Sequence, residues 1–240
     1  MKTIKQGIVL AFISILTISC NIDLLNRIEG NKNVITKKRK VNGDFTKIKV
    51  STGLDVFISQ GNKLSVTIEA DENLHDIIKT EVDGNQLRIY AEKSIWRAKK
   101  ARINVTIDDL EELKATSGSD VYSDGVLKVN NIVLATTSGA DMKVEVNANS
   151  VDASSTSGSD LKVMGETNDF YGSSTSGSNI NAYSLQSKNA TVKVSSGADL
   201  RVYATESLTA RASSGGDIRY KGSPKKATKK SSSGGSISGS

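Results

Sequence analysis

The sequence predicts an all-β protein built as a parallel β-helix, a solenoid of about 19–20 residues per coil, with a β-rich portion capping its N-terminal end. Three observations predict it. A phrase of Ser-Gly, one small residue and then Asp or Asn recurs along residues 113–240, and its glycines lie 18 to 21 residues apart. Apolar and polar residues alternate around each phrase, which is typical of half-buried strands. The turn residues are Gly118 and Asp120, Gly139 and Asp141, Gly158 and Asp160, Gly177 and Asn179, Gly197 and Asp199, and Gly215 and Asp217.

The turn chemistry supports this reading. Glycine adopts a positive φ without a Cβ clash, so it allows the chain to turn, and Asp or Asn can bond the nearby backbone and hold the turn. Each coil is expected to hold two or three short strands joined by turns. Strands that return to the same place on every coil must pair in parallel, with coils roughly 4.8 Å apart.

Stacking also aligns charge along the solenoid. The repeat aspartates should form one column, and a basic column should run two residues away at Lys143, Lys162, Arg201 and Arg219. A bare carboxylate column would repel itself. The basic column offsets this, although exposed ion pairs contribute only about 0–1 kcal/mol each.

The N-terminal 33 residues predict targeting and tethering. Residues 1–19 combine lysines with a short, mostly apolar stretch and indicate a signal peptide, because the twelve residues of this stretch are too few to span a bilayer. The sequence before Cys20, the only cysteine, resembles a bacterial lipobox, except that Thr17 stands where Leu is commoner. Lipidation of Cys20 is therefore expected, with residues 20–33 as a tether; ordinary secretory cleavage beside an incidental cysteine is the alternative. A single cysteine excludes an intrachain disulfide.

Residues 34–112 predict a β-rich portion that includes a first, isolated coil around Gly53 and Asp55. Strands are expected at 64–70, 86–90 and 101–107, with a hairpin turn at 83–85. Residues 71–80 are expected to form one short helix. This portion should cap the solenoid, since an uncovered terminal coil exposes unpaired backbone N–H and C=O groups that can pair with another chain.

The repeat decays at the C-terminal end. Pro224 is the only proline, and Lys225, Lys226, Lys229 and Lys230 follow it. Charge on a terminal coil opposes end-to-end polymerisation, so residues 113–240 are expected to form the β-helix with a basic end.

The chain resembles the head GIN domain family of putative auto-transporter adhesins, found in secreted and lipid-anchored proteins of Bacteroidetes. The resemblance covers about residues 34–240 and rests on the segments at 50–61 and 68–82 together with the Ser-Gly repeats. It implies a right-handed β-helix. It implies neither a known ligand nor catalytic residues, because the adhesin label of the family is itself an inference.

The residues give little support to catalysis. His75 is the only histidine and is expected at the surface or partly packed, and without several His or Cys ligands no zinc site is expected. A calcium-stabilised β-roll is an alternative, but it repeats about every nine residues, and Ca²⁺ requires six to eight oxygens. A β-helix carbohydrate-active enzyme is another alternative, but coils this short leave almost no loops to build a cleft. We therefore expect no enzyme activity, cofactor or metal.

The densest basic cluster contains Arg97, Lys99, Lys100 and Arg102. It could contact anionic glycans or lipid headgroups, or it could be a solvated hairpin loop. The formal charge of +6 falls to +4 on cleavage after Ser19, since two lysines and no acids are removed. A positive charge of this size does not indicate binding to nucleic acid. The sequence thus predicts a lipid-anchored envelope protein with a binding or structural role, its partners being the membrane and a glycan or other envelope component. The ligand, the face of the membrane and the oligomeric state stay open.

Overall fold

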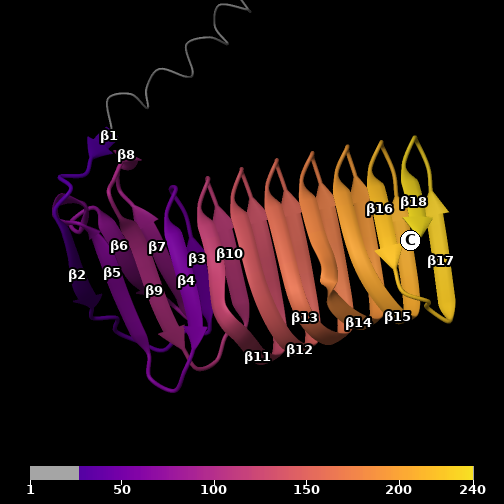
Figure 1. Cartoon of the computed structure of the whole chain (residues 1–240), viewed down its shortest axis with the longest axis horizontal. Helices are drawn as coiled ribbons and strands as arrows, with labels where there is room; N and C mark the ends of the chain where they lie inside the picture. Colours follow the sequence, from indigo (N-terminus) through magenta and orange to yellow (C-terminus); the bar gives the residue numbers. More distant parts are fainter. Residues whose placement is uncertain (1–26, 240) are drawn as a thin grey trace, which may run out of the picture.

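The structure, a computed structural model, describes residues 27–239. The expected signal peptide, Cys20 and the first part of the tether lie outside the described residues. The chain winds as a solenoid from a capped N-terminal end to an open C-terminal end, with the coils side by side along the long axis (Figure 1).

Strands make up nearly the whole fold, with a single 3₁₀ turn, η3, at Glu72–Leu74 among the described residues. The strands are β1 (Arg27–Glu29), β2 (Val34–Arg39), β3 (Lys47–Val50), β4 (Asp55–Gln60), β5 (Ser65–Asp71), β6 (Ile78–Asp83), β7 (Gln86–Ala91), β8 (Ser94–Arg97), β9 (Ala101–Ile107), β10 (Glu112–Thr116), β11 (Asp120–Thr137), β12 (Asp141–Thr156), β13 (Asp160–Thr175), β14 (Asn179–Ser195), β15 (Asp199–Ala212), β16 (Asp217–Lys221), β17 (Lys226–Ser231) and β18 (Ser236–Gly239).

The parallel β-helix is confirmed by the strand pairing. Strands β11 to β15 pair in sequence order, and all of these pairs are parallel. The first coil predicted around Gly53 is also confirmed, because β3 pairs in parallel with β10, and β4 pairs in parallel with β11. The repeats therefore lie in register across the molecule.

Each full coil is one long strand that bends, which corrects the expectation of two or three short strands joined by turns. In β12 the buried positions alternate up to Ala148 and resume at Val151, three residues later. This change of phase marks the corner that divides the coil into a first half, which follows the Ser-Gly turn, and a second half, which leads to the next one. The backbone hydrogen bonds continue through the bend, so no separate strands result.

The core is a narrow file of aliphatic side chains from both halves of the coils. One aromatic side chain, that of Phe170, also lies in the middle of this core and is 1 % exposed. Buried hydroxyls near the turns satisfy one another: Thr136 donates to Ser155, and Ser174 and Ser178 lie 2.9 Å apart across one turn. Small polar residues thus fit inside the coil without unsatisfied groups at these positions.

The N-terminal cap departs from the solenoid by pairing antiparallel. Strand β5 lies between β2 and β9, and β6 forms a hairpin with β7. The three strands and the hairpin turn predicted here are confirmed. The helix predicted for residues 71–80 is wrong, because this segment forms η3, a turn and the start of β6. Hairpin pairing with β7 outweighs the helical spacing of the apolar residues.

A second difference concerns the expected tether. Its last part contains β1, which pairs in parallel with β8 in a separate two-stranded sheet. At the other end of the molecule, β17 pairs with β15 and all its residues are exposed, so the final coil leaves an open edge. Within the described part of the chain, no helix is long and apolar enough to cross a membrane.

Candidate ligand-binding face

The Ser-Gly turns lie along one edge of the solenoid and are bonded to one another. The Gly139 N–H donates to the Ser157 carbonyl at 3.2 Å, and the Gly158 N–H donates to the Ser176 carbonyl at 3.2 Å. The same bond recurs from Gly53 to Gly215, so the predicted turn glycines form one line. These turns also contain a feature that the sequence did not reveal. The serine before each glycine also has a positive φ, for example 57° at Ser157 beside 67° at Gly158.

The predicted aspartates form a column on the outer face of the first half of the coils. Asp55, Asp120, Asp141 and Asp160 are direct register partners, and the column continues through Asn179 to Asp199 and Asp217. Desolvation by burial raises the pKa of Asp55, Asp120 and Asp141 above the usual value, and neighbouring aspartates raise it further at Asp120 and Asp141. Like charges at coil spacing therefore interact.

The basic column lies two residues away, in register from Lys143 through Lys162 and Arg201 to Arg219. Among residues 27–239, no ion pair within 4.0 Å joins it to the aspartates. No group of three or more His, Cys, Asp or Glu side chains in this range could hold a metal ion. The Asp column therefore supplies at most one carboxylate from each coil.

A different surface, the outer face of the second half of the coils, has the character of a binding site. We call it the hydroxyl face, because rows of Ser and Thr cover it. Its residues are Asp152, Ser154, Tyr171, Ser173, Thr175, Thr191, Lys193, Ser195, Thr209, Arg211, Thr228 and Lys230. Alternation places these side chains outward, while the side chains of Ala153 and Val192 between them point into the core.

Tyr171 stands near the middle of this face and is 48 % exposed. It lies where two shallow grooves meet. One, of about 400 Å³, runs toward the C-terminal coils past Thr191, Lys193 and Arg211. The other, of about 630 Å³, runs toward the cap past Asp152 and Glu112. An exposed ring flanked by hydroxyls offers one flat apolar surface among many hydrogen-bonding groups.

The groove continues beyond Arg211 as a larger hollow of about 1040 Å³, lined by Lys193, Arg211, Lys229, Lys230 and seven serine or threonine side chains and by no acid. Charge therefore changes sign along the face. Residues 120–184 contain 3 Lys or Arg against 8 Asp or Glu, whereas residues 185–239 contain 10 against 3. Anionic groups of a ligand would be favoured at the C-terminal part of the hydroxyl face.

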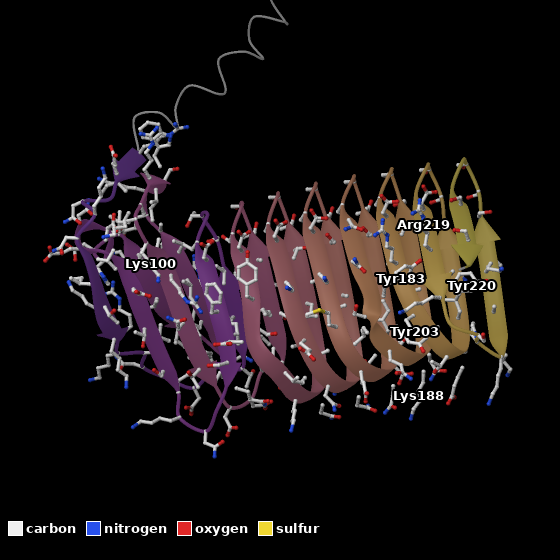
Figure 2. The ribbon with its side chains drawn as sticks, in the orientation of Figure 1. Lys100, Tyr183, Lys188, Tyr203, Arg219 and Tyr220 are labelled. Atoms are coloured by element: carbon white, nitrogen blue, oxygen red, sulfur yellow. The ribbon has the colours of Figure 1, made fainter. Side chains whose placement is uncertain are left out.

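Two other tyrosine rings near the C-terminal end are covered by the side chain of a lysine. Figure 2 shows Tyr183 and Tyr203 on neighbouring coils. The Lys221 ammonium lies 4.6 Å from the centre of the Tyr203 ring and 5.8 Å from that of Tyr183. These rings are only half-buried, yet Lys221 covers them, so Tyr171 is the more accessible stacking platform.

The predicted basic cluster is divided by the structure. Lys100, labelled in Figure 2, pairs with Glu69 at 3.1 Å, and the Arg102 guanidinium lies 3.4 Å from the centre of the Phe57 ring. Arg97 and Lys99 instead lie in and just after β8 and line a hollow of about 570 Å³ with Trp96. Within residues 27–239, neither of these two cations forms an ion pair within 4.0 Å, and Arg97 packs on the Trp96 ring.

His75 differs from the expectation of a surface or partly packed residue, because it is 1 % exposed. Its Nε2 lies 3.1 Å from the Ile35 carbonyl oxygen, which it can bond as a donor. The cap packs around it because η3 turns the chain inward at this point, where the predicted helix would have left it at the surface. The described residues place no serine or cysteine nucleophile against its ring.

Sequence reasoning missed the residues of the hydroxyl face. The Ser-Gly phrase is the most regular part of each repeat and marks the residues that follow it rather than those before it. Counting backward from each turn would have aligned Ser173, Lys193, Arg211 and Lys230, because each lies three residues before the positive-φ serine. The exposure of Tyr171 has no comparable signal, since it is one tyrosine in a column of otherwise smaller residues.

Comparisons with known proteins agree with this architecture. The family model described as "Putative auto-transporter adhesin, head GIN domain" matches residues 44–224. No curated protein matches the sequence.

The chain is also similar to solved structures. A putative adhesin from Bacteroides fragilis NCTC 9343 is 24 % identical with a TM-score of 0.83, covering 89 % of this chain and all of the other. A protein from Parabacteroides distasonis ATCC 8503, described as a putative lipid binding protein, is 23 % identical with a TM-score of 0.72 over 89 % and 99 % of the two chains. A putative adhesin from Parabacteroides merdae ATCC 43184 is 20 % identical with a TM-score of 0.69 over 90 % and 99 %. At these identities the likeness concerns the fold alone.

Proposed function

Because the chain belongs to the head GIN domain family of putative auto-transporter adhesins, we propose that it is a non-catalytic binding module of the cell envelope. Its ligand is a linear glycan that lies along the hydroxyl face. The observation that carries this proposal is Tyr171, an exposed aromatic ring at the junction of two grooves lined by hydroxyl, amide and charged groups.

The chemistry of the face matches that of a sugar polymer. Pyranose rings present an apolar face that packs on aromatic side chains, and their hydroxyls both donate and accept hydrogen bonds, as Ser and Thr do. The coils repeat these groups at roughly 4.8 Å, so successive sugars meet similar partners. A shallow, extended face of this kind is suited to binding a chain along its length rather than enclosing one small molecule.

The proposal includes lipidation at Cys20. The sequence before this cysteine supports it through the small residue Ser19 and the short apolar stretch of the signal peptide. Seven positions separate Cys20 from Arg27, where the described fold begins. Metabolic labelling with a fatty-acid analogue in wild type and in Cys20→Ala tests this part separately.

A glycan array tests the binding function. We expect the purified chain to bind a subset of linear glycans, and Tyr171→Ala to lower their affinity at least tenfold, because one stacked ring is removed. Trp96→Ala is the matched control, since Trp96 is similarly exposed but lies in β8 at the capped end of the molecule, off this face. An array on which the folded wild type binds nothing, or on which both variants bind equally well, would contradict the proposal.

The alternatives are separated by simple measurements. Turnover of any polysaccharide, abolished by changing one acid, would instead favour a carbohydrate-active enzyme. A fall in Tm on addition of a chelator would favour a calcium-stabilised solenoid. We expect neither result, because the Asp column supplies only one carboxylate per coil and its members repel one another.

A further inference from the structure

We infer that the β1–β8 corner of the cap is a membrane-contact site, in which Trp96 enters the interface of a phospholipid bilayer and nearby basic residues meet anionic headgroups. This inference rests on the proposed anchor at Cys20, because the anchor brings this corner to the bilayer. It assigns the orientation of the domain on the membrane, which the binding function leaves open.

Trp96 is presented to solvent by a local irregularity. Strand β1 pairs with β8 at Ile28 and Ile95 and then at Glu29 and Arg97, so Trp96 is an extra residue without a register partner. Such a bulge redirects a side chain out of the regular alternation. Ile28 and Ile95 pack against the core, whereas Trp96 is 54 % exposed. A single exposed ring is not unusual by itself, so the groups around Trp96 decide what it can contact.

The surroundings of the ring carry positive charge. Arg97, Lys99 and Lys32 line the same hollow as Trp96, together with a single acid, Glu29. The Arg97 guanidinium lies 4.2 Å from the centre of the indole ring. Within residues 27–239, none of these three cations has a carboxylate within 4.0 Å. Trp and basic side chains together are the groups that proteins place at the headgroup region of a membrane.

The anchor and this corner are held close together. Arg27, the first described residue, is the register partner of Ser94, two positions before Trp96. The Gly30 N–H then donates to the Arg97 carbonyl at 2.7 Å, and the Lys32 N–H donates to the Asp71 carboxylate at 3.0 Å. The first described residues are therefore bonded to β8, the strand that carries Trp96. Seven residues span at most about 25 Å when extended, so a lipid on Cys20 keeps Arg27 within that reach of the bilayer surface, and Trp96 lies two positions beyond the register partner of Arg27.

The rest of the molecule points elsewhere. Figure 1 shows β1 and β8 projecting together at the capped end, while the open end of the solenoid lies at the opposite extreme. The basic hollow at Lys229 and Lys230 is therefore far from the anchored corner and remains available to other partners. Contact through this corner alone leaves the open end of the solenoid free of the bilayer.

Two features of the sequence make a direct test possible. Trp96 is the only tryptophan and Cys20 the only cysteine. The chain from Cys20 to Ser240, which keeps every described residue, can be coupled through this thiol to maleimide-functionalised phosphatidylethanolamine in phosphatidylcholine vesicles, with or without phosphatidylglycerol. Coupling replaces the biological lipid, so the outcome does not depend on whether cells lipidate Cys20.

We expect the Trp96 emission to shift to shorter wavelength on coupling and to be quenched by brominated lipid chains. With phosphatidylglycerol present, Arg97→Gln with Lys99→Gln should reduce the population in contact with lipid, by about fivefold for each charge removed. Tryptophan emission that stays at the wavelength of the free chain, and is not quenched, would overturn the inference.

The matched control moves the reporter to another site of similar exposure. In Trp96→Phe with Tyr171→Trp, the single tryptophan lies on the hydroxyl face, and its emission should be neither shifted nor quenched. Equal quenching at both positions would mean that the solenoid lies flat on the bilayer, which also overturns the proposed orientation. Glycan binding by the uncoupled Trp96→Phe variant separates this result from a failure of the binding function.

Discussion

At the scale of single residues, Asp71 is the clearest structural anchor of the cap. It is fully buried, and its carboxylate accepts backbone hydrogen bonds from Lys32, Lys99 and Lys100 at 3.0, 3.1 and 3.2 Å. Desolvation by burial alone would raise its pKa. The three hydrogen bonds and the charge of Lys99 outweigh this effect, so the pKa of Asp71 lies below its usual value of 3.8.

Replacing Asp71 with Asn is therefore expected to lower the free energy of unfolding by about 3 kcal/mol at neutral pH. The amide of Asn turns donors toward backbone N–H groups. Because the folded-state pKa is lowered, the contribution of Asp71 is present above pH 3.8 and is lost as pH falls through the folded-state value. Urea unfolding across the acid range should show the two curves converging at low pH. The exposed Asp76→Asn is the control and should unfold like wild type; a similarly stable Asp71→Asn would refute this role.

At the scale of elements, the repeat determines which side chains face each other across neighbouring strands. The aspartates that begin β12 and β13 are direct neighbours, and desolvation, then the charges of Asp120 and Asp160, raise the pKa of Asp141. The column already contains one neutral member, Asn179, whose amide donates to Asp160 at 3.1 Å. An amide is thus compatible with this position in the strand ladder.

Asp141→Asn is accordingly expected to stabilise the protein by about 0.5 kcal/mol at neutral pH, because it relieves repulsion between like charges on adjacent strands. A raised folded-state pKa means that the charged aspartate costs stability above that pKa, and that the cost disappears as pH falls through it. Wild type should therefore gain relative to the variant on acidification. Asp152→Asn serves as control, since its register partners Val133 and Tyr171 are uncharged. A destabilised Asp141→Asn would mean that the turn needs the carboxylate itself.

The repeated coils could be predicted from the sequence because similar residues recur at the same positions in each coil. The Gly158 turn, the apolar Leu161 and the outward Lys162 recur at one spacing, so a single coil describes the others. The cap could not be predicted in the same way. Strand β1 is only three residues long, and its partner β8 begins more than sixty residues later. The exposure of Trp96 depends on that pairing, so local patterns did not indicate it.

At the scale of the whole molecule, the two ends of the solenoid differ in whether their last strands are covered. The cap closes the N-terminal end with antiparallel strands, whereas β17 leaves an edge at the other. On that edge Lys229 occupies the register position that Ala210 fills in the preceding coil, where the side chain would point inward. Its ammonium donates to the Tyr220 hydroxyl at 3.2 Å. Charge at this position opposes addition of a further coil.

Lys229→Val is expected to promote concentration-dependent self-association, because it extends the apolar core row to the exposed edge. Sedimentation at increasing protein concentration measures this, and added salt should strengthen it by screening the remaining lysines. Lys225→Val, which changes the same charge just outside β17, is the matched control and should stay in the state of wild type. If both variants behaved alike, net charge rather than the edge position would control assembly.

The line of hydrogen bonds between successive turns also decides how the molecule would carry a mechanical load. These bonds, like those of the strands, run along the solenoid axis, so a pull along that axis stretches every interface between coils in series. Each interface then bears the same tension, and the weakest yields first, releasing about one coil of chain at a time. With force applied between the capped end and a polymer held at Tyr171, the coils beyond that residue would bear no tension and would keep their structure.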